Sequence, residues 1–167
     1  MRPSGGHVEH VHSHLGAIDA AALPKGMMSD VVDRPALEGI LETVLYCDSS
    51  NEAAARSFYL EVMGFSPLAV DFSYRIGASQ HVFLIFNSDE TPHQTNPPPH
   101  GARGRGHVCF TAASDTYEVW KDYLSEQNVD CTRELTWGNG MRSFYFEDPA
   151  GNVLEIAEGD FWPKPGR

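Results

Sequence analysis

Basic residues are scarce in this chain, with 12 lysines and arginines against 23 aspartates and glutamates and a formal net charge of -11. No stripe of lysine or arginine is present that could neutralise nucleic-acid phosphates, so the composition argues against nucleic-acid binding. The negative charge also disfavours an anionic membrane surface, and no apolar run approaches the roughly 18 residues needed to span a bilayer. We therefore expect neither nucleic acid nor a membrane as a partner.

Cysteine is also scarce. Cys47, Cys109 and Cys131 have neither CxxC spacing nor an even count, which argues against a disulfide framework and against a cysteine zinc site. The first residues lack the continuous apolar segment of a signal peptide. Together these absences predict a cytoplasmic protein.

The 167 residues suffice for one domain, or for two small modules that share a core. We expect residues 1–36 to form a flexible N-terminal tail and residues 163–167 to form a short C-terminal tail. A histidine-rich tract can bind transition metals loosely, but the one in the first tail precedes all patterned sequence, so we leave it out of the candidate site. It consists of His7, His10, His12 and His14.

The patterned region begins with a first module, residues 37–86. Its residues 40–46 are rich in β-branched and aromatic side chains and predict a strand. Ser49 and Glu52 have the spacing of a capping box at a helix start, and Gly64 is placed to end that helix. Three more strand-like runs follow, giving the order βαβββ, at residues 65–70, 72–76 and 82–86.

A linker rich in proline and glycine, residues 87–106, separates this module from a second one, residues 107–162. The second module repeats the order βαβββ, with a helix capped by Ser114 and strands near 107–110, 131–135, 142–146 and 153–157. Neither module alone could bury both faces of a four-stranded sheet. The sequence therefore predicts an α+β fold in which two βαβββ modules form an eight-stranded, cup-shaped mixed sheet with the helices outside.

One acid in the last strand is unusual. The segment from Asp148 to Asn152 contains a proline and a glycine and predicts a tight turn. Glu155 follows within a short apolar strand, where a carboxylate is costly to bury unless something positive meets it. From the residues alone, three partners stay open for Glu155: an arginine, a metal ion, or water at an exposed sheet edge.

Strand alternation places two further candidates on the same inner face of the cup as Glu155. Glu42 is the charged residue of the inward set on the first strand, and His107 holds the equivalent position on the opening strand of the second module. One imidazole and two carboxylates suit a divalent first-row metal, with positions left for water or substrate. The first-module position that corresponds to Glu155 is Leu84, which cannot ligate.

These segments resemble those of the vicinal-oxygen-chelate superfamily, which includes glyoxalase I, extradiol dioxygenases, fosfomycin-resistance proteins, epimerases and bleomycin-binding proteins. The resemblance covers about residues 38–162. It rests on four segments, namely Ile40 to Tyr46, Ser57 to Phe65 with its Phe58-Tyr59 and Gly64-Phe65 pairs, Gly106 to Phe110, and Asp148 to Glu155.

The resemblance implies that a divalent metal is held by Glu42, His107 and Glu155 on the opening and closing strands. The first of these positions is commonly histidine in the superfamily, so Glu42 is a departure. A carboxylate in place of a neutral imidazole cancels more of the ion's charge and favours Mn²⁺ or Mg²⁺, with Fe²⁺, Co²⁺, Ni²⁺ and Zn²⁺ left open. Members commonly form dimers, and some build each cup from two chains, so a homodimer is expected.

The dioxygenase branch of the superfamily is matched only in part. Tyr145 resembles a substrate-contacting tyrosine of that branch, and His81 its acid–base histidine, although strict alternation from Leu84 turns His81 away unless a bulge intervenes. A further histidine of that branch corresponds to a position near Thr136 and is missing here. Because Glu42 also replaces a ligand histidine, the iron site is not reproduced, and an extradiol-type dioxygenase is the weaker alternative.

The resemblance implies chemistry in which a small metabolite with two adjacent oxygens chelates the ion while a nearby base moves a proton. A glyoxalase-like lyase, isomerase or epimerase is the function that this favours. The candidate catalytic residues are Glu42, Glu155, His81 and Tyr145. The candidate substrate contacts are Tyr145, Arg75, Trp137 and Arg142, of which the last two fit packing or charge bridging better.

A metal-free small-molecule binding or sequestration protein, like the bleomycin-binding members, is the alternative from another functional class. It is favoured by Leu84, which leaves the fourth ligand position without a donor. It is also favoured by a supply of aromatic side chains suited to binding, namely Phe72, Tyr74, Trp137 and Tyr145.

Overall fold

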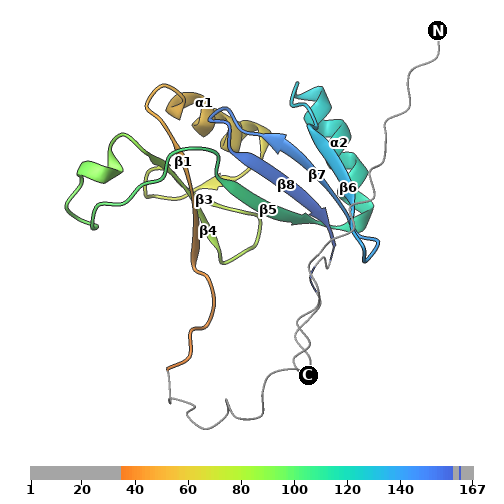
Figure 1. Ribbon diagram of the computed structural model, residues 1–167, viewed down its shortest axis with the longest axis horizontal. Helices are drawn as coiled ribbons and strands as arrows, with labels where there is room; N and C mark the ends of the chain where they lie inside the picture. Colours follow the sequence, from red (N-terminus) through yellow and green to blue (C-terminus); the bar gives the residue numbers. More distant parts are fainter. Residues whose placement is uncertain (1–34, 160–161, 163–167) are drawn as a thin grey trace.

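The computed structural model of the chain describes residues 35–159 and Trp162 (Figure 1). Nearly all of the expected N-terminal tail, with its four histidines, and all of the expected C-terminal tail lie outside the described residues. Within the described part, no helix is long and apolar enough to cross a membrane. The described chain contains two sheets, each of four strands.

The first module is a four-stranded sheet with one helical segment. Its strands alternate between a helix side, where Leu45, Phe83 and Ile85 are buried, and an open face. The sheet order is β1-β4-β3-β2, with β1 parallel to β4. The elements are β1 (Glu42–Cys47), α1 (Glu52–Ser57), the π-helical turn η2 (Phe58–Val62), β2 (Ser66–Pro67), β3 (Ser73–Arg75) and β4 (Val82–Asn87).

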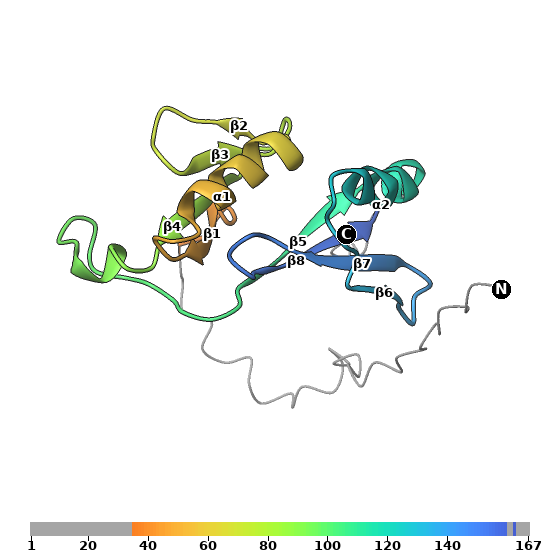
Figure 2. The same cartoon turned by 90° about the horizontal axis from the view of Figure 1, so that it is seen from above.

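The second module repeats this arrangement in the order β5-β8-β7-β6, with β5 parallel to β8. The helix α2 lies over one face of this sheet, and the opposite face carries no helix of the described residues (Figure 2). The elements are β5 (His107–Ala112), the 3-10 turn η4 (Ser114–Thr116), α2 (Tyr117–Glu126), β6 (Arg133–Thr136), β7 (Arg142–Glu147) and β8 (Val153–Glu158). The two βαβββ modules predicted from the sequence are therefore confirmed.

Backbone pairing does not join the two sheets within the described residues, so the eight strands form two separate sheets in one chain. The modules instead share an apolar core. The ring of Phe110 on β5 packs edge-on against Phe65 and Phe83 of the first module, at centroid distances of 5.5 and 5.9 Å. The helix sides of both sheets thus contribute to one core, and the open faces of both sheets lie on the opposite sides.

The first helix begins differently from the capping box expected at Ser49 and Glu52. The side chain of the N-cap residue, Asn51, makes no capping hydrogen bond, and Asp48 Oδ1 accepts the Asn51 backbone amide at 3.0 Å. The Ser49 hydroxyl donates to Asp89 at 3.0 Å, and Glu52 accepts from the Asn87 side chain at 2.7 Å. The capping-box prediction is wrong because the Glu52 side chain binds Asn87 at the end of β4 and the Ser49 side chain binds Asp89 just after it. Gly64, at φ +67, ends the helical segment as expected.

The linker between the modules folds back onto the C-terminal ends of β1 and β4. It begins with the 3-10 turn η3 (Thr91–His93), and the buried Thr91 hydroxyl donates to the Asn87 carbonyl oxygen at 3.1 Å. Further along, Arg103 pairs with Asp89 at 2.8 Å. The first contact ties the start of the linker to the last residue of β4, and the second joins the two ends of the linker to each other.

A buried polar network joins the two modules in the turn before β8. Asp148 accepts a hydrogen bond from the Tyr59 hydroxyl at 2.7 Å and two more from backbone amides of its own turn. Asn152 donates its side-chain amide to the Tyr46 carbonyl oxygen at 3.0 Å and accepts the Gly106 amide at 2.9 Å. The network therefore fixes the start of β5 and β8 against the first module.

Gly106 has no room for a side chain at this junction. A Cβ atom there would lie 2.7 Å from Leu45 Cδ2 and 2.8 Å from Asn152 Oδ1. We expect Gly106→Ala to lower the free energy of unfolding by about 1–3 kcal/mol because the side chains around it must shift. Urea denaturation measures this change, and an unaltered transition midpoint would show that the junction is looser than described.

Candidate functional site

The open face of the second sheet carries an array of polar side chains. On β5, His107, Cys109 and Thr111 are exposed on this face, while Val108 and Phe110 point to the helix side and pack against the core. This is the alternation expected from the sequence.

Glu155 lies at the centre of this face. The register places it beside Cys109 on β5 and beside Tyr145 on β7. Its side chain is only 8% exposed, so water does not solvate the carboxylate freely. The carboxylate is therefore met by neighbouring side chains.

His107 is oriented so that one ring nitrogen faces Glu155. His107 Nδ1 lies 3.0 Å from the Val153 carbonyl oxygen. A carbonyl oxygen only accepts hydrogen bonds, so Nδ1 carries the ring hydrogen, and Nε2 of the neutral ring presents a lone pair. His107 Nε2 is 3.4 Å from Glu155 Oε2. The neutral ring and the carboxylate would thus point two acceptors at each other.

This pair of acceptors is the test of whether the residues fit a metal. Two lone pairs at 3.4 Å repel unless a positive charge lies between them, either a proton on Nε2 or a metal ion. A carbonyl oxygen that holds the distal nitrogen is also the usual partner of a metal-binding histidine. His107 and Glu155 therefore fit two ligand positions of a divalent ion.

The second oxygen of Glu155 is held by Tyr145, whose hydroxyl donates to Glu155 Oε1 at 2.9 Å. The rings of Tyr145 and His107 are stacked at a centroid distance of 6.2 Å. Desolvation, together with the Glu155 carboxylate, raises the pKa of Tyr145 to about 12, against a weaker opposing contribution from Ser143. Tyr145 is therefore a neutral hydrogen-bond donor at physiological pH.

Cys109 contacts Glu155 from the neighbouring strand. Desolvation by the surrounding strands, and then the charge and hydrogen bond of Glu155, raise the pKa of the Cys109 thiol to about 12. The thiol is thus protonated at physiological pH, and its Sγ lies 3.6 Å from the Phe110 carbonyl oxygen, to which it donates. Cys47, Cys109 and Cys131 are all free.

The third expected ligand, Glu42, begins β1 on the open face of the other sheet, where it is exposed. Among the described residues, no group of three or more histidines, cysteines, aspartates or glutamates is close enough to hold a metal. One chain therefore brings His107 and Glu155 together, but it does not bring Glu42 to them.

The register agrees with the internal repeat that assigned Leu84 to the position of Glu155. In the first sheet, Glu42 pairs with Val82 and Val44 with Leu84. In the second sheet, His107 pairs with Val153 and Cys109 with Glu155. Glu155 therefore holds the position in the second sheet that Leu84 holds in the first. Leu84 is buried and brings no donor, so the first sheet offers one ligand position and the second sheet two.

Trp137 lies close to the second-sheet site. Its indole Nε1 donates to the Ser143 hydroxyl at 2.9 Å, and Ser143 stands two residues before Tyr145 on the same face of β7. The indole therefore lies beside Ser143 on β7, where it can contact a ligand bound near Tyr145.

Arg142 lies on the other side of the second sheet. Its guanidinium donates to Glu118 at 2.6 Å and to Glu158 at 3.0 Å, and it lies 4.4 Å from the centroid of the Tyr117 ring. These contacts bridge α2 and β8 on the helix side. We therefore leave Arg142 out of the proposed site.

His81 and Arg75 belong to the first module and are not near the His107–Glu155 pair in sequence or sheet. His81 is exposed, and its backbone amide is bonded to the Ser79 hydroxyl at 3.0 Å. The pairing of β4 with β1 is regular from Val82 onward, so the described strand has no bulge that would turn His81 inward. Arg75, on the open face of β3, donates to the Ser79 carbonyl oxygen at 3.2 Å.

Sequence reasoning missed His100 in the linker. Its Nδ1 lies 2.8 Å from the hydroxyl of Tyr46, on the open face of the first sheet. Strand alternation identified Tyr46 as an inward residue, but no local pattern links it to a histidine 54 positions away. Only the folded linker brings the two together.

The two βαβββ modules, each with a four-stranded mixed sheet, are the fold of a protein of the vicinal-oxygen-chelate type. Residues 41–156 match the family model of the Glyoxalase/Bleomycin resistance protein/Dioxygenase superfamily. The chain belongs to this superfamily.

Solved structures agree with this assignment. A crystal structure of lactoylglutathione lyase from Agrobacterium tumefaciens is 33% identical, with a TM-score of 0.66, and the match covers 75% of this chain and 97% of that one. A glyoxalase/bleomycin resistance protein/dioxygenase from Nocardioides is 16% identical, with a TM-score of 0.59 and coverage of 81% and 92%. A virulence protein from Salmonella typhimurium is 21% identical, with a TM-score of 0.57 and coverage of 74% and 98%.

At their low identities, the Nocardioides and Salmonella structures support the fold alone. The comparison with curated proteins returned no match.

Proposed function

We propose that the protein is a metal-dependent, glyoxalase-like lyase. The observation that carries this proposal is the acceptor pair of His107 Nε2 and Glu155 Oε2, 3.4 Å apart on an open sheet face. The match to a lactoylglutathione lyase at 33% identity favours a hemithioacetal of a 2-oxoaldehyde and glutathione as the substrate. Other compounds with two adjacent oxygens fit the same site less specifically.

The metal ligands in this proposal come from two copies of the chain. His107 and Glu155 of one copy form one part, and Glu42 of a second copy forms the other, since a single chain does not bring the three together. Isologous pairing of two chains would generate two equivalent sites. A homodimer is therefore part of the proposal.

The proposed reaction is an isomerisation, so atoms and electrons balance without an oxidant. A base removes the proton from the carbon that carries sulfur and hydroxyl and returns it to the adjacent carbonyl carbon. The hydroxyl proton passes to the former carbonyl oxygen, which gives a 2-hydroxy thioester. A divalent ion at this site would stabilise the negative charge that develops on the substrate oxygens. Mn²⁺, Mg²⁺, Fe²⁺, Co²⁺, Ni²⁺ and Zn²⁺ are the ions to test.

The chain's own residues orient the reacting groups. Tyr145 holds Glu155 Oε1 and leaves Oε2 directed at His107. The carbonyl of Val153 keeps His107 Nε2 toward the same point. Glu155 of one copy and Glu42 of the other are the carboxylates that we propose as bases. His81, which is exposed and bonded to Ser79, is the weaker candidate for this role.

Metal content and turnover test the proposal together. The four tail histidines are first replaced by alanine, because they would otherwise add metal to the count. We expect about one divalent ion per chain. We also expect metal-dependent conversion of the methylglyoxal–glutathione hemithioacetal to a thioester, and the ultraviolet absorbance of the thioester measures this conversion. Protein that binds no divalent ion after exposure to all six metals would overturn the proposal.

A metal-free binding protein is the second candidate, and one observation favours it. Glu155 already has a neutral donor in Tyr145, at 2.9 Å, so the carboxylate has a hydrogen-bond partner without a metal. In that case, a proton on His107 would replace the ion. Ligand binding that is unchanged by chelators and by metal addition would favour this candidate.

A further inference from the structure

The linker presents a histidine to the open face of the first sheet. His100 Nδ1 lies 2.8 Å from the Tyr46 hydroxyl. The His100 ring also lies 5.2 Å from Phe86 and 6.1 Å from Tyr46, measured between ring centroids. Tyr46 and Phe86 are the last open-face residues of β1 and β4, which pair at this point. His100 therefore extends the open face beyond the C-terminal ends of β1 and β4.

This position is remote from the proposed metal. Glu42 and Tyr46 share the open face of β1 and are four residues apart, which at the strand rise of about 3.3 Å per residue is about 13 Å. A compact substrate with two adjacent oxygens, bound at Glu42, would not reach His100. A substrate with a long arm would.

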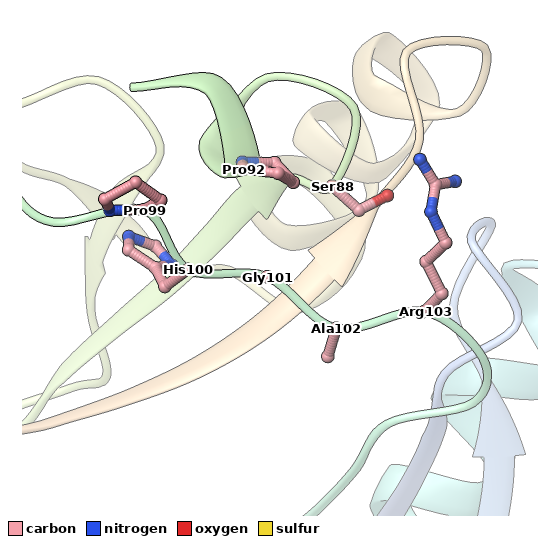
Figure 3. Close-up of a pocket in the computed structure, with 7 residues that line it drawn as sticks. All are labelled: Ser88, Pro92, Pro99, His100, Gly101, Ala102 and Arg103. Carbon is pink, nitrogen blue, oxygen red and sulfur yellow. The ribbon is translucent and has the colours of Figure 1, made fainter. Parts of the chain in front are cut away.

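The linker also forms an open recess of about 280 Å³ next to His100 (Figure 3). Its polar side chains are His100, Arg103 and the buried Ser88, and its remaining lining is small or apolar. Arg103 pairs with Asp89 through Nη2 at the rim, and its side chain is exposed there. The recess is thus polar and lies at the end of the open face that carries Glu42.

We infer that this linker recess, with His100 at its mouth, is the subsite for the polar, carboxylate-bearing arm of an elongated substrate. The inference rests on the proposed function, since glutathione supplies such an arm. His100 and Arg103 are the cationic or donor groups for a carboxylate, with the acidic Asp89 beside Arg103. Tyr46 positions His100. Binding of the remote arm is a source of specificity that does not depend on the reacting carbons.

Paired substrates separate the arm from the reacting centre. The hemithioacetals of methylglyoxal with glutathione and with 2-mercaptoethanol share the reacting atoms, but only the first has the arm. For His100→Ala, we expect KM for the glutathione adduct to rise at least about tenfold, with kcat within about twofold. Both constants for the 2-mercaptoethanol adduct should stay at the wild-type values.

Two further variants control for structure. Tyr46→Phe removes only the hydroxyl that holds His100 and is expected to raise the same KM by a smaller factor. His93→Ala removes an exposed histidine of the same linker and should leave both substrates unaffected. Retention of hydrogen-bonding groups in His100→Gln is expected to recover part of the lost affinity. Equal effects of His100→Ala on the two adducts would overturn the inference.

Direct binding distinguishes failure of this inference from failure of the proposed function. S-methylglutathione is titrated into wild-type and His100→Ala protein by calorimetry, and at least about tenfold weaker binding by the variant is expected. If neither protein binds it, or both bind equally, the subsite is wrong, whatever the metal content and turnover show. If binding differs but no metal is held, the proposed function fails and the subsite stands.

Discussion

Replacement of Glu155 with glutamine is expected to lower the affinity for a divalent ion by at least about 100-fold and to reduce turnover to background. Removal of a partner that only orients a ligand already costs about 10–100-fold, and Glu155 is proposed as a ligand itself. Glutamine keeps the shape of the side chain and can still accept from the Tyr145 hydroxyl, which now donates at 2.9 Å. Metal affinity is measured by titration against a competing chelator.

Glu158→Gln is the matched control for this change. Glu158 lies on the same strand, but it bonds Arg142 on the helix side at 3.0 Å. The variant should therefore bind metal as the wild type does. Wild-type affinity in Glu155→Gln would mean that the carboxylate has only a structural role.

Replacement of Asp148 with alanine is expected to lower the free energy of unfolding by about 3–5 kcal/mol. The change leaves the hydroxyl of Tyr59, which is 0% exposed, without its acceptor at 2.7 Å. It also removes the acceptor of the Asn152 side-chain amide, at 2.8 Å. Each buried polar group left without a partner costs about 1–3 kcal/mol. Urea denaturation, analysed with the same m-value for both proteins, gives the difference in the free energy of unfolding.

Asp122→Ala provides the comparison for this prediction, because Asp122 is an exposed aspartate on α2. A surface change of that kind is expected to alter the free energy of unfolding by no more than about 0.5 kcal/mol. Tyr59→Phe should lie between the two variants, since it removes one hydrogen bond and leaves no unpaired donor. A change for Asp148→Ala as small as that for Asp122→Ala would contradict the buried network.

Strand periodicity made the two modules and the second-sheet site predictable. Alternation alone placed His107, Cys109 and Glu155 on one face, and the pairing of β5 with β8 and of β8 with β7 brings the last of these to Tyr145. These relations depend only on neighbouring strands within one module. The alternation of side chains along each strand is therefore enough to predict these neighbours from the sequence.

The features that sequence could not predict depend on contacts between distant segments. Alternation places Arg142 opposite Tyr145, but no local pattern identifies Glu118 and Glu158 as its partners. Likewise, no pattern in the linker indicates that His100 meets Tyr46. The separation of the two sheets is also set by the shared aromatic core, in which Phe110 packs on Phe65 and Phe83.

The same separation explains why three candidate ligands identified by symmetry are not all together in one chain. The internal repeat gave equivalent positions to Glu42 and His107, and the register agrees with that equivalence. Equivalence in a repeat does not fix how two modules sit against each other. Because the open faces lie away from the shared core, the second chain supplies the missing ligand in our proposal.

Complementation between two inactive variants tests this arrangement most directly. Glu42→Gln and Glu155→Gln proteins are each expected to be inactive alone. In a mixed dimer, one site would contain both substitutions and the other neither, so an equal mixture that exchanges subunits randomly should recover about one quarter of the wild-type activity and of the tight metal sites. Recovery to that level is the predicted result, and a mixture that stays as inactive as its components would contradict a site shared between two chains.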